Sequence, residues 1–294
     1  MRGMVLSFAL LLVLTTPALA GLNVVATLPW IGSAAKEIGK DKINVTVLVK
    51  PGQDAHVIEA KPSMILAARK ADILLYNGLD LEIGYLPLII ESSKNPKLMP
   101  GQPGNFDCSQ FITVLEKPAT VDRSMGDVHP FGNPHYHFSP SRVLRVVEAM
   151  ARLLADADKE NAGYYEANYK AFAERLHDKE RQWHAVPLQG KKFIAYHKYF
   201  EYLSAEYRLK IIGYIEPKPG IPPSAAHIEG LIETMKREKP AAILVTPAHG
   251  MKEAGSLSAK TGVKVIVLPH DVGSMDGTGD LISFWDRVVS LLEE

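Results

Sequence analysis

The sequence predicts an α/β protein with two lobes, each built on a mostly parallel β-sheet and joined to the other by one long, rigid helix. Three observations support this fold. Short runs rich in β-branched residues alternate with longer amphipathic segments near both ends of the chain. Such strand–helix–strand repeats place helices on the faces of a parallel sheet. Between these regions, residues 158–183 contain no proline and no glycine after Gly163, which is typical of one continuous helix.

The first twenty residues predict a secretory signal peptide. Arg2 is their only charged residue, residues 4–14 are mainly apolar, and residues 18–20 read ALA, a small-x-small cleavage pattern. The alternative is an uncleaved membrane anchor, but the apolar run is shorter than the roughly 20 residues that span a bilayer. We therefore expect a chain beginning at Gly21. Because that residue is not cysteine, we expect no lipid anchor and a periplasmic location.

The N-terminal lobe is predicted over residues 21–157. One of its expected helices has proline in its first turn, where the missing N–H removes no helical hydrogen bond. Ser139 and Pro140 are predicted to open another helix, as its N-cap and its first helical residue. Two segments rich in glycine, proline, asparagine and aspartate are expected to be loops. The expected strands are 22–28, 43–49 and 72–76, the helices 30–40 and 62–70, and the loops 100–108 and 118–134.

A linking helix over residues 158–188 and a C-terminal lobe over residues 189–294 complete the predicted architecture. Apolar, strand-like runs resume in this lobe, with helical segments between them. The expected strands are 192–196, 210–214, 241–245 and 264–268, and a last helix is expected near 281–292. Because the sequence has no flexible glycine/serine linker, we expect hinge motion between the lobes to be limited.

The composition excludes some classes of function. Lys and Arg together number 33, as do Asp and Glu, so the net charge is zero. Nucleic-acid binding usually requires a basic excess, so no nucleic-acid partner is expected. Hydrophobic residues make up 47% of the chain and charged residues 22%, which is typical of a globular protein. With one cysteine, Cys108, the chain cannot form an internal disulfide.

Three of the ten histidines occupy positions that favour metal ligation. His56 lies in a turn-forming loop after a strand, His135 lies just before the helix start at Ser139, and His197 ends a strand. Sites in open α/β folds form at the carboxyl ends of strands. The 79 and 62 positions that separate these histidines exclude a zinc finger, whose ligands come in close pairs. A single loop histidine is more often not a ligand, and spacing alone does not select these three.

Five stretches carry a resemblance to the zinc- and manganese-binding family of ABC-transporter solute-binding proteins. PGQDAHVIE at 51–59 resembles P-G-x-D-P-H-x-x-E, with Ala55 in place of proline. NGLDLE at 77–82 is similar to N-G-x-x-x-E, and NPHYHFSP at 133–140 to N-P-H-x-W-L-D-P. YEAN at 165–168 looks like the start of the family's linking helix, and EPKPGIPPS at 216–224 resembles E-P-x-P-G-x-x-P-S. The resemblance runs from Val24 to the C-terminus, and the five stretches that carry it are spread over nearly the whole mature chain.

The resemblance implies metal ligands at His56, His135 and His197, in a cleft between the lobes. Manganese-binding members often have glutamate at the third position, so His197 favours Zn²⁺ over Mn²⁺. The family's fourth ligand is usually an aspartate before the last helix, which makes Asp280 the candidate and Asp271 the second choice. We also expect zinc affinity to fall as the pH drops through ~6.5, the reference histidine pKa.

Four other histidines have open roles. His129 is the one histidine in the loop where some zinc-binding members carry a long histidine-rich segment. His137 replaces the family's bulky aromatic residue, and His249 and His270 also depart from its pattern. These last three are interpreted as surface residues, with an outer contact to the metal ligands or direct ligation as the alternatives.

The implied function is high-affinity capture of Zn²⁺ by the periplasmic component of an ABC importer, with Mn²⁺ or another divalent metal as the alternative. The implied partner is an inner-membrane ABC permease, and the chain is expected to be a monomer without enzymatic activity. A zinc-dependent hydrolase is less favoured, because the sequence contains neither H-E-x-x-H nor G-x-S-x-G. A surface adhesin would need an anchor, and a siderophore or vitamin B12 binder would need clustered arginine or aromatic residues.

Overall fold

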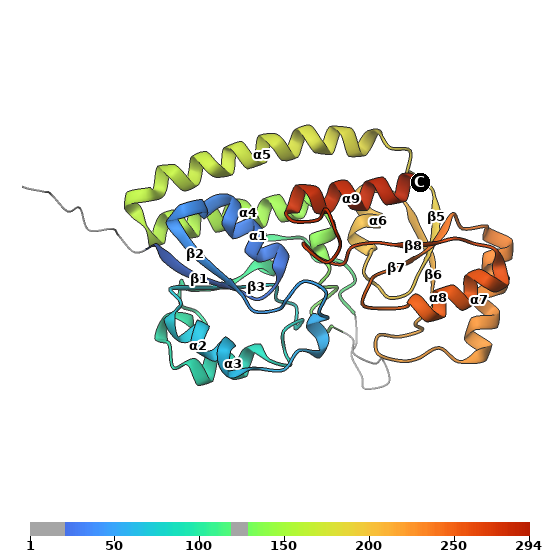
Figure 1. Cartoon of the computed structure of the whole chain (residues 1–294), viewed down its shortest axis with the longest axis horizontal. Coiled ribbons are helices and arrows are strands. Elements are labelled where there is room, and N and C mark those ends of the chain that lie inside the picture. The colour runs from blue at the N-terminus through green and yellow to red at the C-terminus, as the bar shows by residue number, and fades with distance from the viewer. Residues whose placement is uncertain (1–20, 119–128) are drawn as a thin grey trace, which may run out of the picture.

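Two four-stranded sheets, with strand orders β2-β1-β3-β4 and β6-β5-β7-β8, form the centres of two lobes (Figure 1). All the strand pairs are parallel. The computed structural model describes residues 21–118 and 129–294, so the predicted signal peptide over residues 1–20 lies outside the described residues. The predicted fold of two parallel-sheet lobes and a long helix is confirmed.

In the N-terminal lobe, α1 and α4 cover one side of the sheet, and α2 and α3 lie on the other (Figure 1). All four helices have proline in the first turn, where a backbone N–H would have no helical partner. The strands are β1 (Leu22–Ala26), β2 (Ile43–Val47), β3 (Ile73–Tyr76) and β4 (Asn105–Asp107), and the helices are α1 (Pro29–Gly39), α2 (Pro62–Lys70), α3 (Leu86–Ser93) and α4 (Pro140–Ala157).

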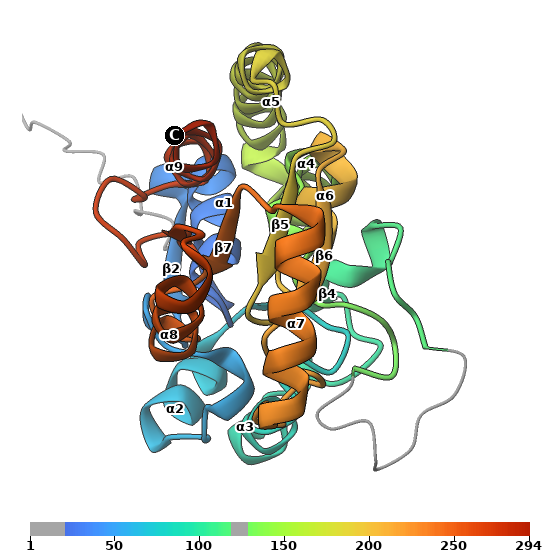
Figure 2. The same cartoon turned by 90° about the vertical axis from the view of Figure 1, so that its right-hand side faces the viewer.

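The C-terminal lobe shows the two-residue alternation of strand side chains. Phe193 and Ala195 join the main core, whereas Ile194 packs into a smaller core beneath α7 and α8. Figure 2 views this lobe end-on, with α5 above it. The strands are β5 (Lys192–Ala195), β6 (Lys210–Tyr214), β7 (Ala242–Val245) and β8 (Val265–Val267), and the helices are α6 (Glu201–Tyr207), α7 (Ala225–Glu238), α8 (Met251–Thr261) and α9 (Leu281–Glu293).

Helix α5 (Ala162–Ala185) runs across both lobes (Figure 1). It packs on α4 and α1 of the first lobe and on α9, the last helix of the chain. The Asp286 carboxylate of α9 accepts a hydrogen bond of 2.8 Å from Trp183 Nε1 and pairs with Lys179 at 2.8 Å, which ties α9 to α5. The lobes are therefore connected by packed helices, and their buried side chains form one main core.

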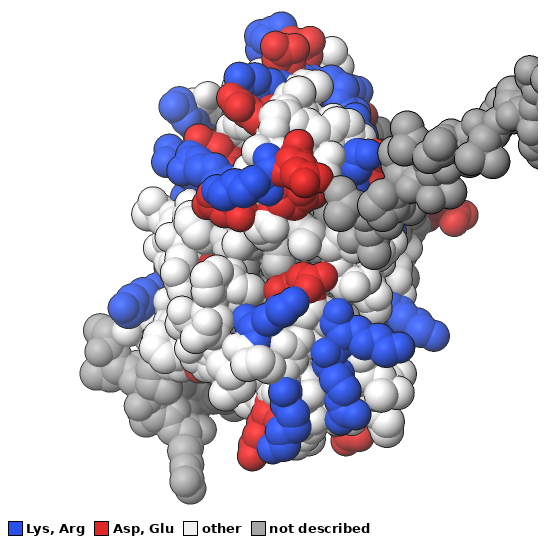
Figure 3. Space-filling model, turned by 90° about the vertical axis from the view of Figure 1, so that its left-hand side faces the viewer, with Lys and Arg blue, Asp and Glu red and all other residues white. Residues whose placement is uncertain are grey.

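The surface carries charges of both signs. On the face shown in Figure 3, basic and acidic side chains are interspersed with uncharged surface, in keeping with the zero net charge of the sequence. None of the helices in residues 21–118 and 129–294 combines the length and apolar character that crossing a bilayer requires.

Candidate metal centre

The carboxyl ends of the parallel strands of both lobes meet at the interface between the lobes. His56 lies in a 3-10 turn, η2 (Ala55–Val57), that follows β2, and His197 comes two residues after β5. His135 precedes another 3-10 turn, η6 (Tyr136–Phe138), which leads into α4. Strand ends of parallel sheets lie at one edge, so loops that are far apart in the sequence converge there.

Three imidazoles gather at this interface. The ligand atoms of His56, His129 and His135 all lie within 4.8 Å of one another. His56 Nε2 and His129 Nε2 are 3.0 Å apart. His197 borders this group, with its ring centroid 5.8 Å from that of His56 and 5.5 Å from that of His135. The structure thus brings together the three predicted histidines and adds His129.

Two carboxylates orient two of the histidines. His56 Nδ1 lies 2.7 Å from Asp54 Oδ1, and His197 Nδ1 lies 2.5 Å from Glu216 Oε2. When Nδ1–H donates to a carboxylate, the neutral imidazole leaves its Nε2 lone pair free for a metal. These carboxylate–histidine pairs are the arrangement that usually stands behind metal-ligating histidines.

His135 is the most deeply buried histidine of the group. The whole residue is 3% exposed. Its backbone N–H donates to Asn133 Oδ1 at 2.9 Å, and this hydrogen bond holds the turn. Among the described residues, nothing makes a hydrogen bond with His135 Nε2. An unpaired buried nitrogen is costly, and a metal ion would satisfy it.

Burial lowers the pKa of three of these imidazoles. It lowers the pKa of His129 to about 3 and the pKa of His135 well below the ordinary value, and nearby histidines act in the same direction. Burial also lowers the pKa of His197, although Glu216 opposes this. Burial raises the pKa of Asp54, but hydrogen bonds from His249 and His56 outweigh it and hold the pKa well below its usual range. The centre therefore presents neutral nitrogens backed by an ionised carboxylate.

The two aspartates predicted as the fourth ligand lie in different settings. Asp280 is exposed and caps α9, with its Oδ1 accepting from Ser283 N at 2.8 Å. The structure does not place it in the histidine group. Asp271 is buried and lines a small cavity with His56 and His135, and burial raises its pKa to about 8. The identity of the fourth ligand stays a prediction, and the structure adds His129 to the candidates.

His137, His249 and His270 are interpreted from the sequence as surface residues. That interpretation is wrong for His137 and only partly right for His249 and His270. His137 is buried, stacks on Trp30 with an interplanar angle of 12°, and has Nε2 2.8 Å from the His270 carbonyl oxygen. It therefore fills the place of an aromatic residue, as its position in the motif implies. His249 and His270 are half-buried. A side chain that stacks within the core gives no local sequence signal that separates it from an exposed one.

The sequence also matches a known protein family over nearly its whole length. A family model described as the periplasmic zinc-uptake complex component A, ZnuA, matches residues 24–294. The chain belongs to the ZnuA family. The resemblance to zinc- and manganese-binding solute-binding proteins is therefore confirmed.

Similar proteins of this kind include zinc and manganese binders. The high-affinity zinc uptake system protein ZnuA of Bacillus subtilis (strain 168) is 26% identical over 260 residues, which cover 84% of this chain and 77% of that protein. The manganese ABC transporter substrate-binding lipoprotein ScaA of Streptococcus gordonii is 25% identical over 251 residues, 83% of this chain and 78% of the other. A crystal structure of ZnuA has a TM-score of 0.77 at 26% identity and covers 93% of this chain and 98% of that one.

The zinc-binding lipoprotein AdcA of Streptococcus pneumoniae (strain ATCC BAA-255 / R6) is 26% identical over 249 residues, 84% of this chain. These residues make up 49% of AdcA, so the chain spans about half the length of that relative. The relatives thus include a zinc-binding lipoprotein, a zinc uptake protein and a manganese ABC transporter substrate-binding lipoprotein.

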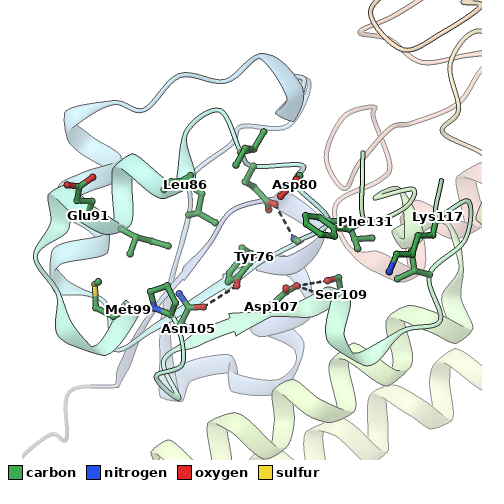
Figure 4. Close-up of a pocket in the computed structure, with 18 residues that line it drawn as sticks. Tyr76, Asp80, Leu86, Glu91, Met99, Asn105, Asp107, Ser109, Lys117 and Phe131 are labelled. Atoms are coloured by element: carbon green, nitrogen blue, oxygen red, sulfur yellow. Dashed lines mark hydrogen bonds between the residues drawn. The ribbon is translucent and has the colours of Figure 1, made fainter. Parts of the chain in front are cut away.

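Two cavities flank the histidines of this ZnuA-family centre. One, of about 480 Å³, is lined by His129, His135 and His197. The other, of about 270 Å³, is lined by His56, His197 and His249. A larger cavity of about 750 Å³ lies in the N-terminal lobe, where Tyr76, Leu86, Met99 and Phe131 surround it (Figure 4). None of the described histidines lines this larger cavity, so we separate it from the metal centre.

Proposed function

We propose that this chain captures Zn²⁺ for an ABC importer and holds the ion between its lobes with His56, His129, His135 and His197. The observation that carries this proposal is the convergence of imidazoles from distant segments, with two of them backed by carboxylates. Zinc favours four nitrogen or sulfur ligands in a tetrahedron. Here the ion is the cargo of the protein, and the neutral imidazoles are its ligands.

The composition of the centre favours zinc over manganese. Imidazole suits zinc, copper, nickel and iron, whereas manganese prefers carboxylate and carbonyl oxygens. The group of nearby ligand atoms in the described residues contains histidines only. The carboxylates Asp54 and Glu216 are engaged with the far sides of His56 and His197, which is a role in orientation. Two relatives are consistent with this choice: the zinc-binding lipoprotein AdcA of Streptococcus pneumoniae and the zinc uptake protein ZnuA of Bacillus subtilis.

Capture and release also fit the centre better than hydrolysis. A catalytic zinc keeps one position open for water, whereas four imidazoles would fill the tetrahedron. We further propose that the mature chain begins at Gly21, acts in the periplasm as a monomer, and delivers zinc to an inner-membrane permease.

A competition titration tests the choice of metal. Metal-free protein lacking residues 1–20 is titrated with Zn²⁺ in the presence of excess Mn²⁺, and the bound metals are measured by elemental analysis. We expect stoichiometric zinc with little manganese, because the ligands are nitrogens. Stoichiometric bound manganese with little zinc at the end of this titration would contradict the proposal.

A further inference from the structure

His249 joins the two lobes beside the metal centre. It lies in a turn after β7, in the C-terminal lobe, and its Nε2 is 3.1 Å from Asp54 Oδ2 in the N-terminal lobe. Its Nδ1 is 3.1 Å from the Tyr199 hydroxyl oxygen. In the neutral tautomer with a proton on Nε2, the imidazole donates to Asp54 and accepts from the Tyr199 hydroxyl. Both ring nitrogens are then satisfied by groups next to the centre.

The two partners of His249 each contact candidate ligands. The other Asp54 oxygen, Oδ1, lies 2.7 Å from His56 Nδ1. The Tyr199 ring lies against His135 and His197, with centroid distances of 4.3 and 4.6 Å. His249 is therefore linked to three of the four proposed ligands, to His56 through Asp54 and to His135 and His197 through Tyr199.

The turn that carries His249 is shaped to hold its ring. The ring is stacked on Tyr196 with an interplanar angle of 11° and a centroid distance of 6.4 Å. The next residue, Gly250, has a φ of +86°, and a Cβ there would lie 2.4 Å from Cγ of Tyr196. Glycine is the residue that can adopt this backbone conformation without a clash. The imidazole is thus fixed by an aromatic face, a special turn and two hydrogen-bonding partners.

We propose that His249 is a positioning residue, which links Asp54 to Tyr199 across the lobe interface and so sets where His56 lies relative to His135 and His197. This inference rests on the proposed function, since it concerns the same centre. His249 itself does not bind the ion. It restricts the Asp54 carboxylate and the Tyr199 ring, and through them it keeps the ligands of both lobes at zinc-binding distance. Outer contacts of this kind typically change metal affinity by about 10- to 100-fold.

Co²⁺ is a suitable probe, because the visible absorption of bound Co²⁺ differs between tetrahedral and higher-coordinate sites. The variants are His249→Ala, His249→Gln, the ligand variant His56→Ala as a reference, and a control, His177→Ala, whose side chain is exposed on α5. Each is measured for its Co²⁺ spectrum, its zinc affinity by chelator competition, and its thermal unfolding. The glutamine amide can still donate to Asp54, so it provides a conservative rescue.

We expect His249→Ala to weaken zinc binding by about 10- to 100-fold and to change the Co²⁺ spectrum, as expected for an outer contact. His249→Gln should recover part of the zinc affinity and part of the Co²⁺ spectrum. His177→Ala should have the zinc affinity and the spectrum of the wild type. A wild-type spectrum and zinc affinity in His249→Ala would overturn the inference, even if that variant unfolded at a lower temperature. A loss as large as that of His56→Ala would also overturn it, by making His249 a ligand. Wild-type protein that binds neither metal would instead overturn the proposed function, and this inference with it.

Discussion

The four histidines of the centre come from two kinds of place in the fold, and the two kinds are controlled differently. His56 and His197 follow strands of different lobes, and each has Nδ1 against a carboxylate. His129 and His135 come from the connection between β4 and α4, and burial is the largest influence on the pKa of each. One pair is oriented by carboxylates at Nδ1, whereas the other depends on burial, which also lowers the pKa of His197. The following experiments separate these two means of preparing a ligand.

The largest effect is expected on removing a ligand. His135→Ala and His197→Ala should each lower zinc affinity by more than about 100-fold, beyond the range of outer-shell changes, because each loses a direct bond to the ion. The matched control is His137→Ala, which removes a buried imidazole two positions from His135 that stacks on Trp30. Zinc calorimetry with a competing chelator measures all three. A larger loss of zinc affinity in His137→Ala than in either ligand variant would indicate that His137 is itself a ligand.

The next experiment separates His129 from Asp280 as the fourth ligand. His129→Ala should weaken zinc binding by at least about tenfold, since it removes an imidazole from the group. Asp280→Ala should leave zinc affinity nearly unchanged and lower the free energy of unfolding by about 1 kcal/mol, as expected for a lost N-cap. Zinc affinity and urea unfolding of the metal-free protein are measured on both variants. The reverse pattern of affinities would restore Asp280 as the fourth ligand.

Removing the orienting charge should have a moderate effect. Asp54→Asn and Glu216→Gln keep the shape of the side chain, and each should lower zinc affinity by about 10- to 100-fold. Asp178→Asn, at an exposed site on α5, is the matched control and should leave zinc affinity unchanged. Unchanged affinity in Glu216→Gln would show that burial alone prepares His197, and the distinction between the two pairs would fail.

The smallest effect concerns pH. Because burial lowers the pKa of His129 to about 3, its imidazole stays neutral throughout the range from pH 7 to pH 5.5. The factor by which His129→Ala weakens zinc binding should therefore be the same at both pH values. The fall in total zinc affinity that the sequence predicts near pH ~6.5 should begin at a lower pH, because burial also lowers the pKa of His135 and of His197. A His129 contribution that disappears at pH 5.5 would contradict the role of burial.

The parts of the fold that follow local rules could be predicted from the sequence. The alternation of β-branched runs with amphipathic segments identified the parallel sheets. Strand β4 was missed, because its three residues lie within residues 100–108, where glycine and proline indicate a loop. Helix α5 begins at Ala162 rather than at 158, because the Asp158 side chain caps a preceding 3-10 turn. Ser139 does occupy the N-cap of α4, but its hydroxyl bonds to Glu206 instead of capping.

The sequence indicated candidate ligands only where a histidine follows a strand or lies in a motif of the family resemblance, and strand position alone did not select them. His56 and His197 come after strands, and His135 belongs to a quoted motif. His129 lies in the glycine- and proline-rich segment 118–134, which has no periodicity to indicate where its side chains point. Its position depends on contacts with a distant histidine, 73 residues away in the chain. The one available hint came from the family resemblance, which implies a histidine-rich loop at this place in some members.

X-ray absorption at the zinc edge would show directly whether four imidazoles hold the ion. The sample is the mature chain loaded with one equivalent of zinc, with the His129→Ala variant measured beside it. Zinc held by four imidazoles should show four nitrogen neighbours at about 2.0–2.1 Å with the outer scattering of imidazole rings, and one ring fewer in the variant. A shell dominated by oxygen, or a wild-type spectrum with fewer than three imidazoles, would contradict it.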